Sequence, residues 1–477
     1  MAPAILWYRR DLRVHDLPAL QAAIESGGDD GVIPVFCFDD RLIHGRFASA
    51  RRTGYLLETL KALDERWHDL GGRLWWRHGD PSKELAKIVD DTGATEVHAT
   101  EDVTAFARAR DDRASNAIEA AGATLHLHPG LAIAADLDAI QTQGGKPHIV
   151  FTPFSKVWAQ QERRQLIKAP TSLHTPRGNR GDLPTLADLG FDAADAKVED
   201  PPEPGEIAGV HHAGQWADGK LASGGLAKYE DLRSDLPSQT SRLSTYLHYG
   251  SLSPLLAERL VLDAGGPGSA TFRNELAWRD FYLNVQRQFP HTATTEFQEK
   301  YRALKWEHDD EALQAWKDGK TGYPVVDAAM RQLNATGFMH NRARMVVASF
   351  LTKDLHLNWR EGEAYFMHQL LDGDLASNNG GWQWTASTGT DPAPYFRRMF
   401  NPTLQQKKFD PKGEYVRRWC PELAGVPDKL LPEPWKMTPE QQADAGCVIG
   451  DDYPEPIVDH AEERGHAVER YQAVSAG

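Results

Sequence analysis

The polar residues at positions 372–384 are the densest group of chemically useful side chains in the sequence. The segment reads DGDLASNNGGWQW and pairs two carboxylates, Asp372 and Asp374, with two amides, Asn378 and Asn379. The glycines that follow allow a ligand to approach the backbone closely. Packing and stability alone do not favour such a collection, so the segment predicts a ligand-binding site.

Three further stretches carry groups that suit a flat or phosphorylated ligand. Residues 240–244 read TSRLS, a hydroxyl-rich turn whose hydroxyls, backbone N–H groups and single guanidinium suit a phosphate. Glu275 and Trp278 share a helix face, where a carboxylate and an indole can bind a flat heterocycle. The third stretch, HNRARM at 340–345, places two arginines in one helical turn. Taken singly, a helix cap, a buried tryptophan and a solvated basic face are the commoner explanations.

The elements that must position these residues fall into two kinds. In the first part of the chain, short apolar runs alternate with helix-length segments such as 51–70 and 107–121. The runs predicted as strands are residues 4–8, 32–38, 73–77, 96–100 and 124–128. This alternation predicts an α/β domain with a doubly wound parallel sheet, whose ligands bind beyond the carboxyl ends of the strands. No GxGxxG follows the first strand, so the dinucleotide fingerprint is absent.

The remainder of the chain predicts a connector and then an all-α domain. Residues 170–225 are rich in Pro, Gly, Asp and Ala and show little periodicity, which indicates a long surface connection. From about Leu226 the pattern is helical. One helix begins with Pro324 in its first turn and is interrupted at Gly337, and a second is expected over 340–353. The predicted domains are therefore residues 1–130, a connector at 131–225, and residues 226–477.

Composition limits the classes of protein that fit. The formal net charge is -15, which favours solubility and argues against nonspecific attraction to nucleic acid. The three cysteines, Cys37, Cys420 and Cys447, have neither metal-ligand nor disulfide-framework spacing, so no metal ligands are assigned. The N-terminus lacks a signal-peptide core, and no stretch is apolar enough to span a bilayer. We expect a monomer in a reducing cytoplasm.

At these motifs the sequence resembles the cryptochrome/photolyase family over nearly its whole length. The matching segments, in order, are WYRRDLRVHDLPAL, TSRLS, NELAWRDFY, GKTGYPVVDAAMRQL, HNRARM and GDLASNNGGWQWTASTGTDPAPYFRRMFNP. The resemblance implies an α/β antenna-binding domain followed by a helical domain that holds FAD and binds DNA. It points to a class I cyclobutane pyrimidine dimer photolyase, a deoxyribodipyrimidine photo-lyase that cleaves carbon–carbon bonds by electron transfer from photoexcited reduced FAD.

Carried over position by position, the resemblance assigns roles to individual residues. Those implied to contact FAD are Tyr229, Thr240, Ser241, Arg242, Leu243, Ser244, Arg344, Asp372, Asp374 and Asn378. Asn378 would lie near the flavin N5, where an amide accepts a hydrogen bond from a protonated nitrogen; plant cryptochromes carry aspartate there. Trp382, Trp359 and Trp306 match the tryptophans that carry an electron to the flavin.

The resemblance also implies a pocket for a dimer flipped out of UV-damaged DNA. Its residues are Glu275, Trp278, Asn341, Arg342, Met345 and Trp384, with Glu275 stabilising the dimer radical anion. Photolyases for (6-4) photoproducts carry histidines at the positions of Asn341 and Met345, because that chemistry needs a proton donor. Between residues 394 and 420, basic side chains that include Arg397 and Lys407 exceed acidic ones by five, which suits phosphate contacts.

Two points stay open in the sequence. Folate-binding members carry Asn-Glu before an RARD sequence, but Phe106-Ala107 precedes it here; His248 stands where deazaflavin-binding members often have lysine. A deazaflavin antenna is slightly favoured over folate, with an empty antenna site as the alternative. For function, the alternatives are a cryptochrome-type blue-light photoreceptor without repair activity, and a nucleotide-binding α/β protein with a helical partner-binding domain.

Overall fold

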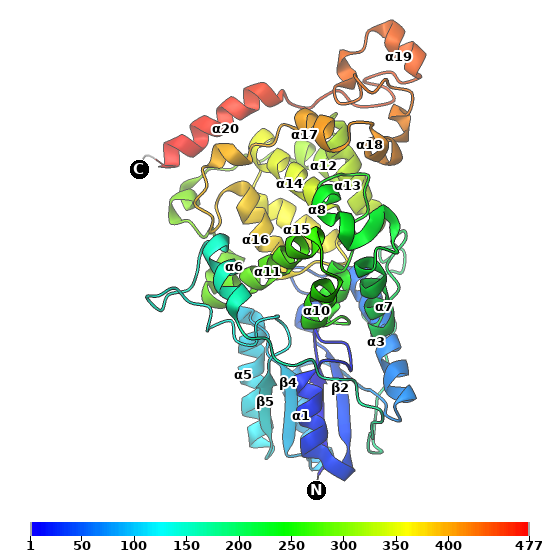
Figure 1. Cartoon of the computed structure of the whole chain (residues 1–477), viewed down its shortest axis with the longest axis vertical. Coiled ribbons are helices and arrows are strands. Elements are labelled where there is room, and N and C mark those ends of the chain that lie inside the picture. Colours follow the sequence, from blue (N-terminus) through cyan, green and yellow to red (C-terminus); the bar gives the residue numbers. More distant parts are fainter. Residues whose placement is uncertain (1, 476–477) are drawn as a thin grey trace. The chain divides into compact units, whose positions relative to one another are not determined.

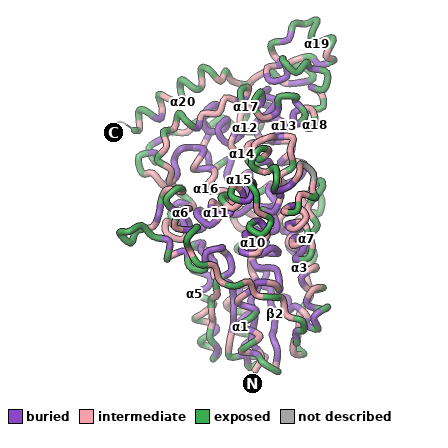
Figure 2. The backbone as a smooth tube through the Cα atoms, viewed as in Figure 1, coloured by how far each residue is buried: buried purple, intermediate pink, exposed green. Residues whose placement is uncertain are grey.

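A computed structural model describes residues 2–475, with the side chains of residues 222 and 223 left out. The chain divides into two compact units. Unit 1 comprises the residues up to Lys197, Pro202–Glu230 and Ser241–Pro290; unit 2 comprises Val198–Pro201, Asp231–Thr240 and the chain from His291 onward. Each unit has its own buried core (Figure 2).

Unit 1 is built on a five-stranded parallel sheet (Figure 1). Its strands are β1 (Ala4–Tyr8), β2 (Val32–Phe38), β3 (Trp75–His78), β4 (Glu96–Thr100) and β5 (Thr124–His128), in the order β3-β2-β1-β4-β5. The predicted bounds of β1, β2, β4 and β5 are confirmed, and β3 begins two residues later than expected. The order reverses between β1 and β4, which confirms the doubly wound topology.

The helices of unit 1 cover this sheet and extend beyond it. They are α1 (Pro18–Gly27), α2 (Asp40–Ile43), α3 (Ala50–Asp69), α4 (Pro81–Thr92), α5 (Ala105–Ala120), α6 (Phe151–Gln160), α7 (Glu206–Ala217), α8 (Tyr229–Leu232, which continues into unit 2), α9 (Ser244–Tyr249), α10 (Pro254–Ala264) and α11 (Pro267–Gln288). Alternate strand residues such as Ile5, Trp7 and Val97 form one core with Ile88 of α4 and Ile118 of α5. The period of two in the strands thus supplies the face on which α4 and α5 pack.

Helix α7 was not predicted, because it lies inside the segment expected to be a connection without regular structure. Its sequence, EIAGVHHAGQWA, contains glycines and histidines and lacks a clear apolar stripe. Tertiary contacts hold it instead. The Glu206 carboxylate accepts the backbone N–H groups of Val14 (2.8 Å) and His15 (3.0 Å), and Gly209 lies so close to Tyr246 that a Cβ would be 2.8 Å from its ring.

Unit 2 is helical. Its helices are α12 (Asp310–Asp318), α13 (Pro324–Thr336), α14 (Asn341–Ser349), α15 (Trp359–Gln369), α16 (Leu375–Ala386), α17 (Pro402–Phe409), α18 (Glu414–Trp419), α19 (Pro439–Ala445) and α20 (His460–Ser475). The prediction for α13 is confirmed: Pro324 begins it, and Gly337 ends it in the left-handed conformation, with φ of 64°. The helix expected over 340–353 is regular only to Ser349, after which a π-helical turn, η5 (Phe350–Asp354), follows.

Within residues 2–475, no helix combines the length and the apolarity that crossing a bilayer requires.

Candidate functional site

The predicted phosphate-binding turn belongs to unit 1 from Ser241 onward and leads into α9 as expected. Ser241 is buried, and its Oγ accepts a hydrogen bond from the Leu243 backbone N–H at 3.4 Å. Arg242 has a φ of 50°, a left-handed conformation that is uncommon for a residue with a side chain. Leu243 is the N-cap of α9 and makes no side-chain cap bond, so the helix-cap explanation of this turn is not supported.

The ring of Tyr229 makes edge contacts with two aromatic residues of unit 1, Trp216 at 5.6 Å and Phe272 at 5.3 Å between centroids. These contacts fix its orientation, which a residue that positions a cofactor needs. Thr240, the first residue of the predicted turn, falls in unit 2.

Helix α11 presents Glu275 and Trp278, both half-buried, one turn apart as predicted. Trp278 stacks face to face on Phe151, with centroids 3.6 Å apart and planes at 6°, and it also lies 5.5 Å from the Tyr282 ring. Phe151 is not among the residues predicted from sequence, because this stacking partner is far from Trp278 along the chain. Together these rings form an aromatic surface on unit 1.

Asp280, on the same helix, joins α11 to α6, the helix that begins at Phe151 and carries Trp158. One of its oxygens accepts the backbone N–H groups of Ile133 (2.9 Å) and Ala134 (3.0 Å) and the indole N–H of Trp158 (2.9 Å). Asp280 is fully buried, and desolvation raises the pKa of its carboxyl despite these donors. Asp280 could not be predicted from sequence, since its partners come from distant segments of the chain.

In unit 2, α14 carries the HNRARM residues. His340 is the N-cap, and its Nδ1 accepts the backbone N–H of Arg342 at 3.1 Å. Asn341 is exposed and Met345 half-buried, and their i, i+4 spacing puts both on one face of the helix. Arg342 donates to the Ser234 hydroxyl at 3.1 Å, which gives this predicted substrate residue a structural partner.

Arg344 and Asp372, both implied by the resemblance to contact FAD, form an ion pair with each other. One guanidinium nitrogen lies 3.1 Å and 2.9 Å from the two Asp372 oxygens, and Nε donates to the carbonyl of Met339 at 2.8 Å. The Asp372 side chain is only 3% exposed, whereas that of Arg344 is 27% exposed, so the carboxylate is the buried partner of the ion pair.

The segment 372–384 is partly structural, which corrects the view that stability gives it no reason to exist. Asp374 caps α16, accepting the Ser377 N–H at 2.8 Å. Asn379 donates to the Glu363 carboxylate at 2.7 Å and accepts from Gln383 at 3.1 Å. The first of these bonds joins α15 to α16, and the second lies within α16.

Asn378 is held by one end of its amide. Its Nδ2 donates to the backbone carbonyl of Glu363 at 3.1 Å, and the residue is half-buried. Among the described residues, its Oδ1 accepts no hydrogen bond. The amide is thus fixed in orientation with an acceptor left for a ligand.

Trp359 and Trp382 are buried in the core of unit 2, and Trp306 is partly buried against that core. Gly362 of α15 makes room for Trp382 of α16: a Cβ at Gly362 would lie 2.0 Å from the indole ring. The indole N–H of Trp359 donates to Glu296 at 3.1 Å, and the Arg360 guanidinium lies 4.6 Å from the centre of its ring.

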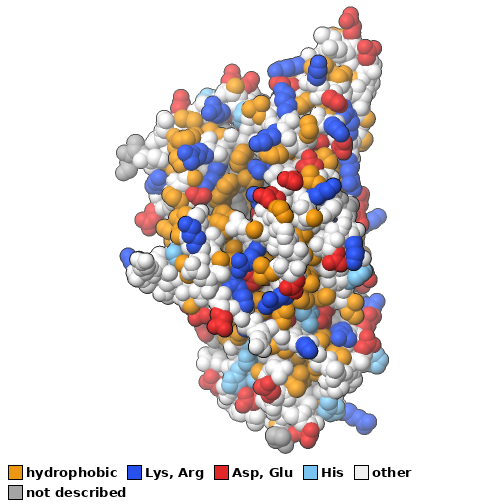
Figure 3. Space-filling model, viewed as in Figure 1, with side chains coloured by type: hydrophobic (Ala, Val, Ile, Leu, Met, Phe, Trp, Pro, Cys, Tyr) orange, Lys and Arg blue, Asp and Glu red, His pale blue; other side chains and the backbone are white. Residues whose placement is uncertain are grey.

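The basic segment after α16 is less available than its charge suggests. Arg397 and Lys407 are exposed, although Lys407 pairs with Glu433 at 2.7 Å. Arg398 is buried, lies 4.1 Å from the centre of the Trp384 ring and pairs with Asp391, which removes it from the surface charge. Figure 3 shows basic and acidic side chains interspersed over the face in view.

Buried Lys353, which the sequence analysis did not single out, holds the chain that follows α16. Its ammonium donates to carbonyl oxygens of Thr385 (2.9 Å) and Arg398 (3.1 Å) and to the Ser387 hydroxyl (3.0 Å). Burial lowers its pKa well below the usual value.

The carboxyl ends of β1 and β4, where a doubly wound sheet takes its ligands, carry an arginine–aspartate cluster. Arg9 and Arg110 lie 4.7 Å and 4.8 Å from the centre of the Trp7 ring, and both pair with Asp111, at 2.5 Å and 2.9 Å. Arg110 and Asp111 belong to the RARD sequence considered for the antenna. His248, the other residue considered, is half-buried on α9 and makes an edge contact with Tyr249 at 4.7 Å.

Comparison with known proteins extends over both units. Residues 4–174 match the model of the DNA photolyase family, and residues 272–473 match the model of the FAD-binding domain of DNA photolyase. A deoxyribodipyrimidine photo-lyase from Streptomyces griseus is 39% identical over 97% of this chain and 98% of its own length.

Solved structures agree. A bacterial class III photolyase from Agrobacterium tumefaciens is 35% identical with a TM-score of 0.92, covering 100% of this chain and 98% of that one. A cryptochrome from Synechocystis is 27% identical with a TM-score of 0.88, covering 98% of this chain and 99% of that one. With near-complete coverage in sequence and in structure, the chain belongs to the DNA photolyase family and carries that family's FAD-binding domain.

Proposed function

We propose that this chain repairs cyclobutane pyrimidine dimers in DNA, using light and FAD. The observation that carries the proposal is the amide of Asn378, fixed through Nδ2 on the Glu363 carbonyl with Oδ1 left as an acceptor. An acceptor suits a flavin whose N5 is protonated, as in the reduced cofactor that repair requires, and a carboxylate at this position would instead store a proton.

The other predicted FAD residues carry side chains whose chemistry suits the cofactor. Arg344 and Asp372 form an ion pair, and Asp374 is held as the N-cap of α16. The residues of 240–244 offer hydroxyls, one guanidinium and the N–H groups of a turn without a side-chain cap, which suits phosphates. Bound FAD supplies the electron that photoexcitation makes available.

The chain's own residues then select and stabilise the substrate. Glu275 and Trp278 of unit 1 are proposed to contact the flipped dimer. The family resemblance gives the same role to Asn341, Met345 and Trp384 of unit 2. Splitting a cyclobutane ring breaks two carbon–carbon bonds and returns the electron, so no net proton transfer is needed. Methionine at position 345 supplies no proton, which suits this lesion and not a (6-4) product.

We propose that Trp382, Trp359 and Trp306 carry electrons to an oxidised flavin. The surroundings of Trp359 suit transient oxidation of its ring, since Glu296 accepts the indole N–H that becomes more acidic when the ring loses an electron. Arg360 lies near the same ring but is itself bound to both Glu296 oxygens, at 2.9 Å and 3.1 Å, so its charge is largely balanced.

The test is repair by reduced, illuminated protein on oligonucleotides that contain one lesion each. We expect cyclobutane dimers to be repaired and (6-4) products to remain. Glu275→Ala should lower the repair yield per absorbed photon more than it lowers dimer binding, and Glu275→Gln, which keeps a hydrogen-bond donor, should retain part of the yield. Exposed Asn274→Ala on the same helix is the control.

A photoreceptor without repair activity is the second candidate, because the chain is also similar to the Synechocystis cryptochrome. Failure to repair either lesion with fully reduced flavin would favour it, and efficient (6-4) repair would refute the lesion assignment. A deazaflavin antenna is proposed ahead of folate, on the altered residues before RARD and on His248. Chromatography of the chromophores released by denaturation identifies which one is present, if any.

A further inference from the structure

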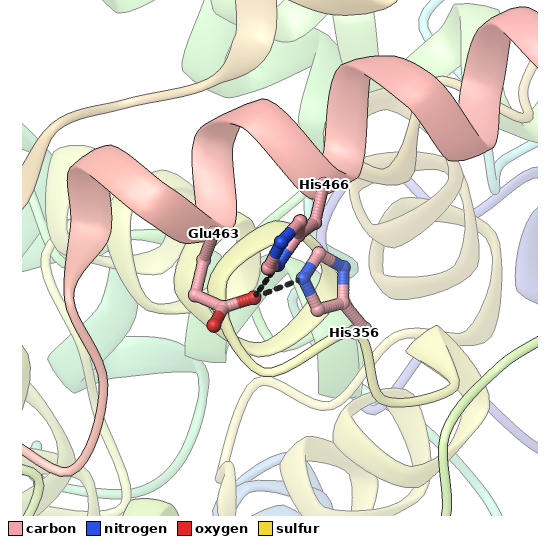
Figure 4. Close-up of side chains that lie close together, drawn as sticks. All are labelled: His356, Glu463 and His466. Carbon is pink, nitrogen blue, oxygen red and sulfur yellow. Dashed lines mark hydrogen bonds and ion pairs between the residues drawn. The ribbon is translucent and has the colours of Figure 1, made fainter.

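Three side chains of unit 2 outside the proposed repair machinery converge on one point. His356 precedes α15, whereas Glu463 and His466 lie one turn apart on α20 (Figure 4). Glu463 Oε2 is 2.7 Å from His356 Nε2 and 3.1 Å from His466 Nδ1. The three potential ligand atoms all lie within 4.8 Å of one another.

We propose that this His356–Glu463–His466 triad binds a divalent transition-metal ion of the zinc class. Two imidazole nitrogens and one carboxylate oxygen form a donor set that zinc uses when a fourth position is left to water. Tetrahedral bonds of about 2.0–2.1 Å place neighbouring ligand atoms about 3.3 Å apart. The two carboxylate-to-imidazole distances, 2.7 Å and 3.1 Å, lie within about 0.6 Å of that value. The two imidazole nitrogens lie within 4.8 Å of each other.

The two segments that carry the ligands, His356 and helix α20, are each fixed by contacts with the rest of unit 2. His356 has a left-handed φ of 52°, and its carbonyl accepts the Glu307 N–H at 2.9 Å. Such a conformation is unfavourable for a non-glycine residue and persists only where its surroundings fix it. Helix α20 is fixed separately, since Tyr471 packs on Tyr301 at 5.5 Å and on Tyr395 at 5.1 Å between ring centroids.

Access and charge also suit a metal ion. The side chain of His466 is 61% exposed and that of Glu463 is 21% exposed, which leaves an open path and room for water. The neighbouring cation, Arg470, pairs with Glu307, and the neighbouring His460 pairs with Asp354. These pairings leave the triad carboxylate to the metal and offset the positive charge beside it.

A bound metal fastens α20 to the chain before α15. His356 and Glu463 are 107 residues apart in the sequence, so no metal-ligand spacing motif could reveal the site. The metal does not enter the proposed repair reaction, so the two proposals stand or fall separately.

The experiment is a zinc titration of the full-length protein, free of any histidine tag and stripped of metal, in competition with a chromogenic chelator. We expect saturable binding of about one Zn²⁺ per chain. His466→Ala removes a ligand from an exposed position, so folding should be kept. Its zinc affinity should fall at least about 100-fold, the upper end of what losing an outer-shell partner costs.

Matched controls are Glu462→Gln against Glu463→Gln on the same helix, and exposed His308→Ala against His466→Ala. Zinc should raise the melting temperature of the wild type and of both controls, and leave that of the ligand variants unchanged. Absence of saturable zinc binding by the wild type, or wild-type affinity in His466→Ala, overturns the proposal. Flavin content and repair, measured in parallel, test the proposed function independently.

Discussion

Replacing Gly362 with alanine should displace Trp382 and slow photoreduction of the flavin. A Cβ at Gly362 would lie 2.0 Å, 2.5 Å and 2.6 Å from three carbons of the indole ring, where ordinary contact begins at 3.4 Å. The ring must therefore retreat by more than an ångström, because Gly362 is buried in α15 and its backbone has little freedom. Electron transfer falls steeply with distance, so a displaced Trp382 should donate more slowly.

Two opposing contributions determine how Gly362→Ala changes the free energy of unfolding. Alanine is favoured over glycine inside a helix by about 1 kcal/mol. Overpacking a filled core costs about 1–3 kcal/mol. Gly362→Ala should therefore change the free energy of unfolding by between about zero and 2 kcal/mol in the destabilising direction.

Gly465→Ala is the matched control, since this glycine lies in α20 and a Cβ there meets nothing within 4 Å. It should stabilise by about 1 kcal/mol and leave photoreduction unchanged. The assays are flavin photoreduction followed by absorbance, and thermal release of flavin followed by fluorescence. If Gly362→Ala stabilises as much as Gly465→Ala and photoreduces at the wild-type rate, the reasoning about the position and role of Trp382 is wrong.

Trp382→Phe should nearly abolish photoreduction of the flavin but spare repair by chemically reduced flavin. The control is Trp316→Phe, because the Trp316 ring lies 6.1 Å from that of Trp382. Equal photoreduction rates in the two variants would refute the proposed electron route. Arg397→Ala and Lys407→Ala should each lower the log–log salt slope of DNA binding by about 0.9, and unchanged slopes would place the DNA surface elsewhere. Burial, together with the charges of Arg342 and Arg344, lowers the pKa of His340 from 6.5 to about 4. Between these two pH values the unfolded chain binds a proton that the folded chain does not. The folded state therefore loses stability as the pH falls from about 6.5 toward 4. Denaturation across this range should show a loss in the wild type of up to about 3 kcal/mol relative to His340→Asn, which keeps the cap acceptor; parallel pH profiles would contradict it.

Local sequence predicted the elements well where local forces decide them. The strands of the sheet are short, β-prone and bounded by turns, and α13 begins at Pro324 and ends at Gly337 through backbone preferences that those residues impose anywhere. Helix α7 was missed because a buried carboxylate, Glu206, and a close glycine contact hold it in place of an apolar stripe.

The same distinction holds for the candidate site. The family resemblance assigned Arg344 and Asp372 to the same site, whereas the stacking of Phe151 on Trp278 and the bonds that Asp280 accepts join segments more than a hundred residues apart. No period or spacing within one segment encodes such contacts. Long-range partners of this kind become visible only when the fold brings the segments together.

The bonds to Asp280 have a consequence for engineering of the chain. Asp280 of α11 bonds to Ile133 and Ala134 and also to Trp158, so the segment between residues 134 and 158 is attached to α11 at both of its ends. Residues 141–146, in the projecting loop beside α6 in Figure 1, are all exposed. A break in the chain or an inserted tag at this loop should leave the aromatic surface intact, which makes it the natural place to divide the protein into two complementing fragments or to attach a reporter.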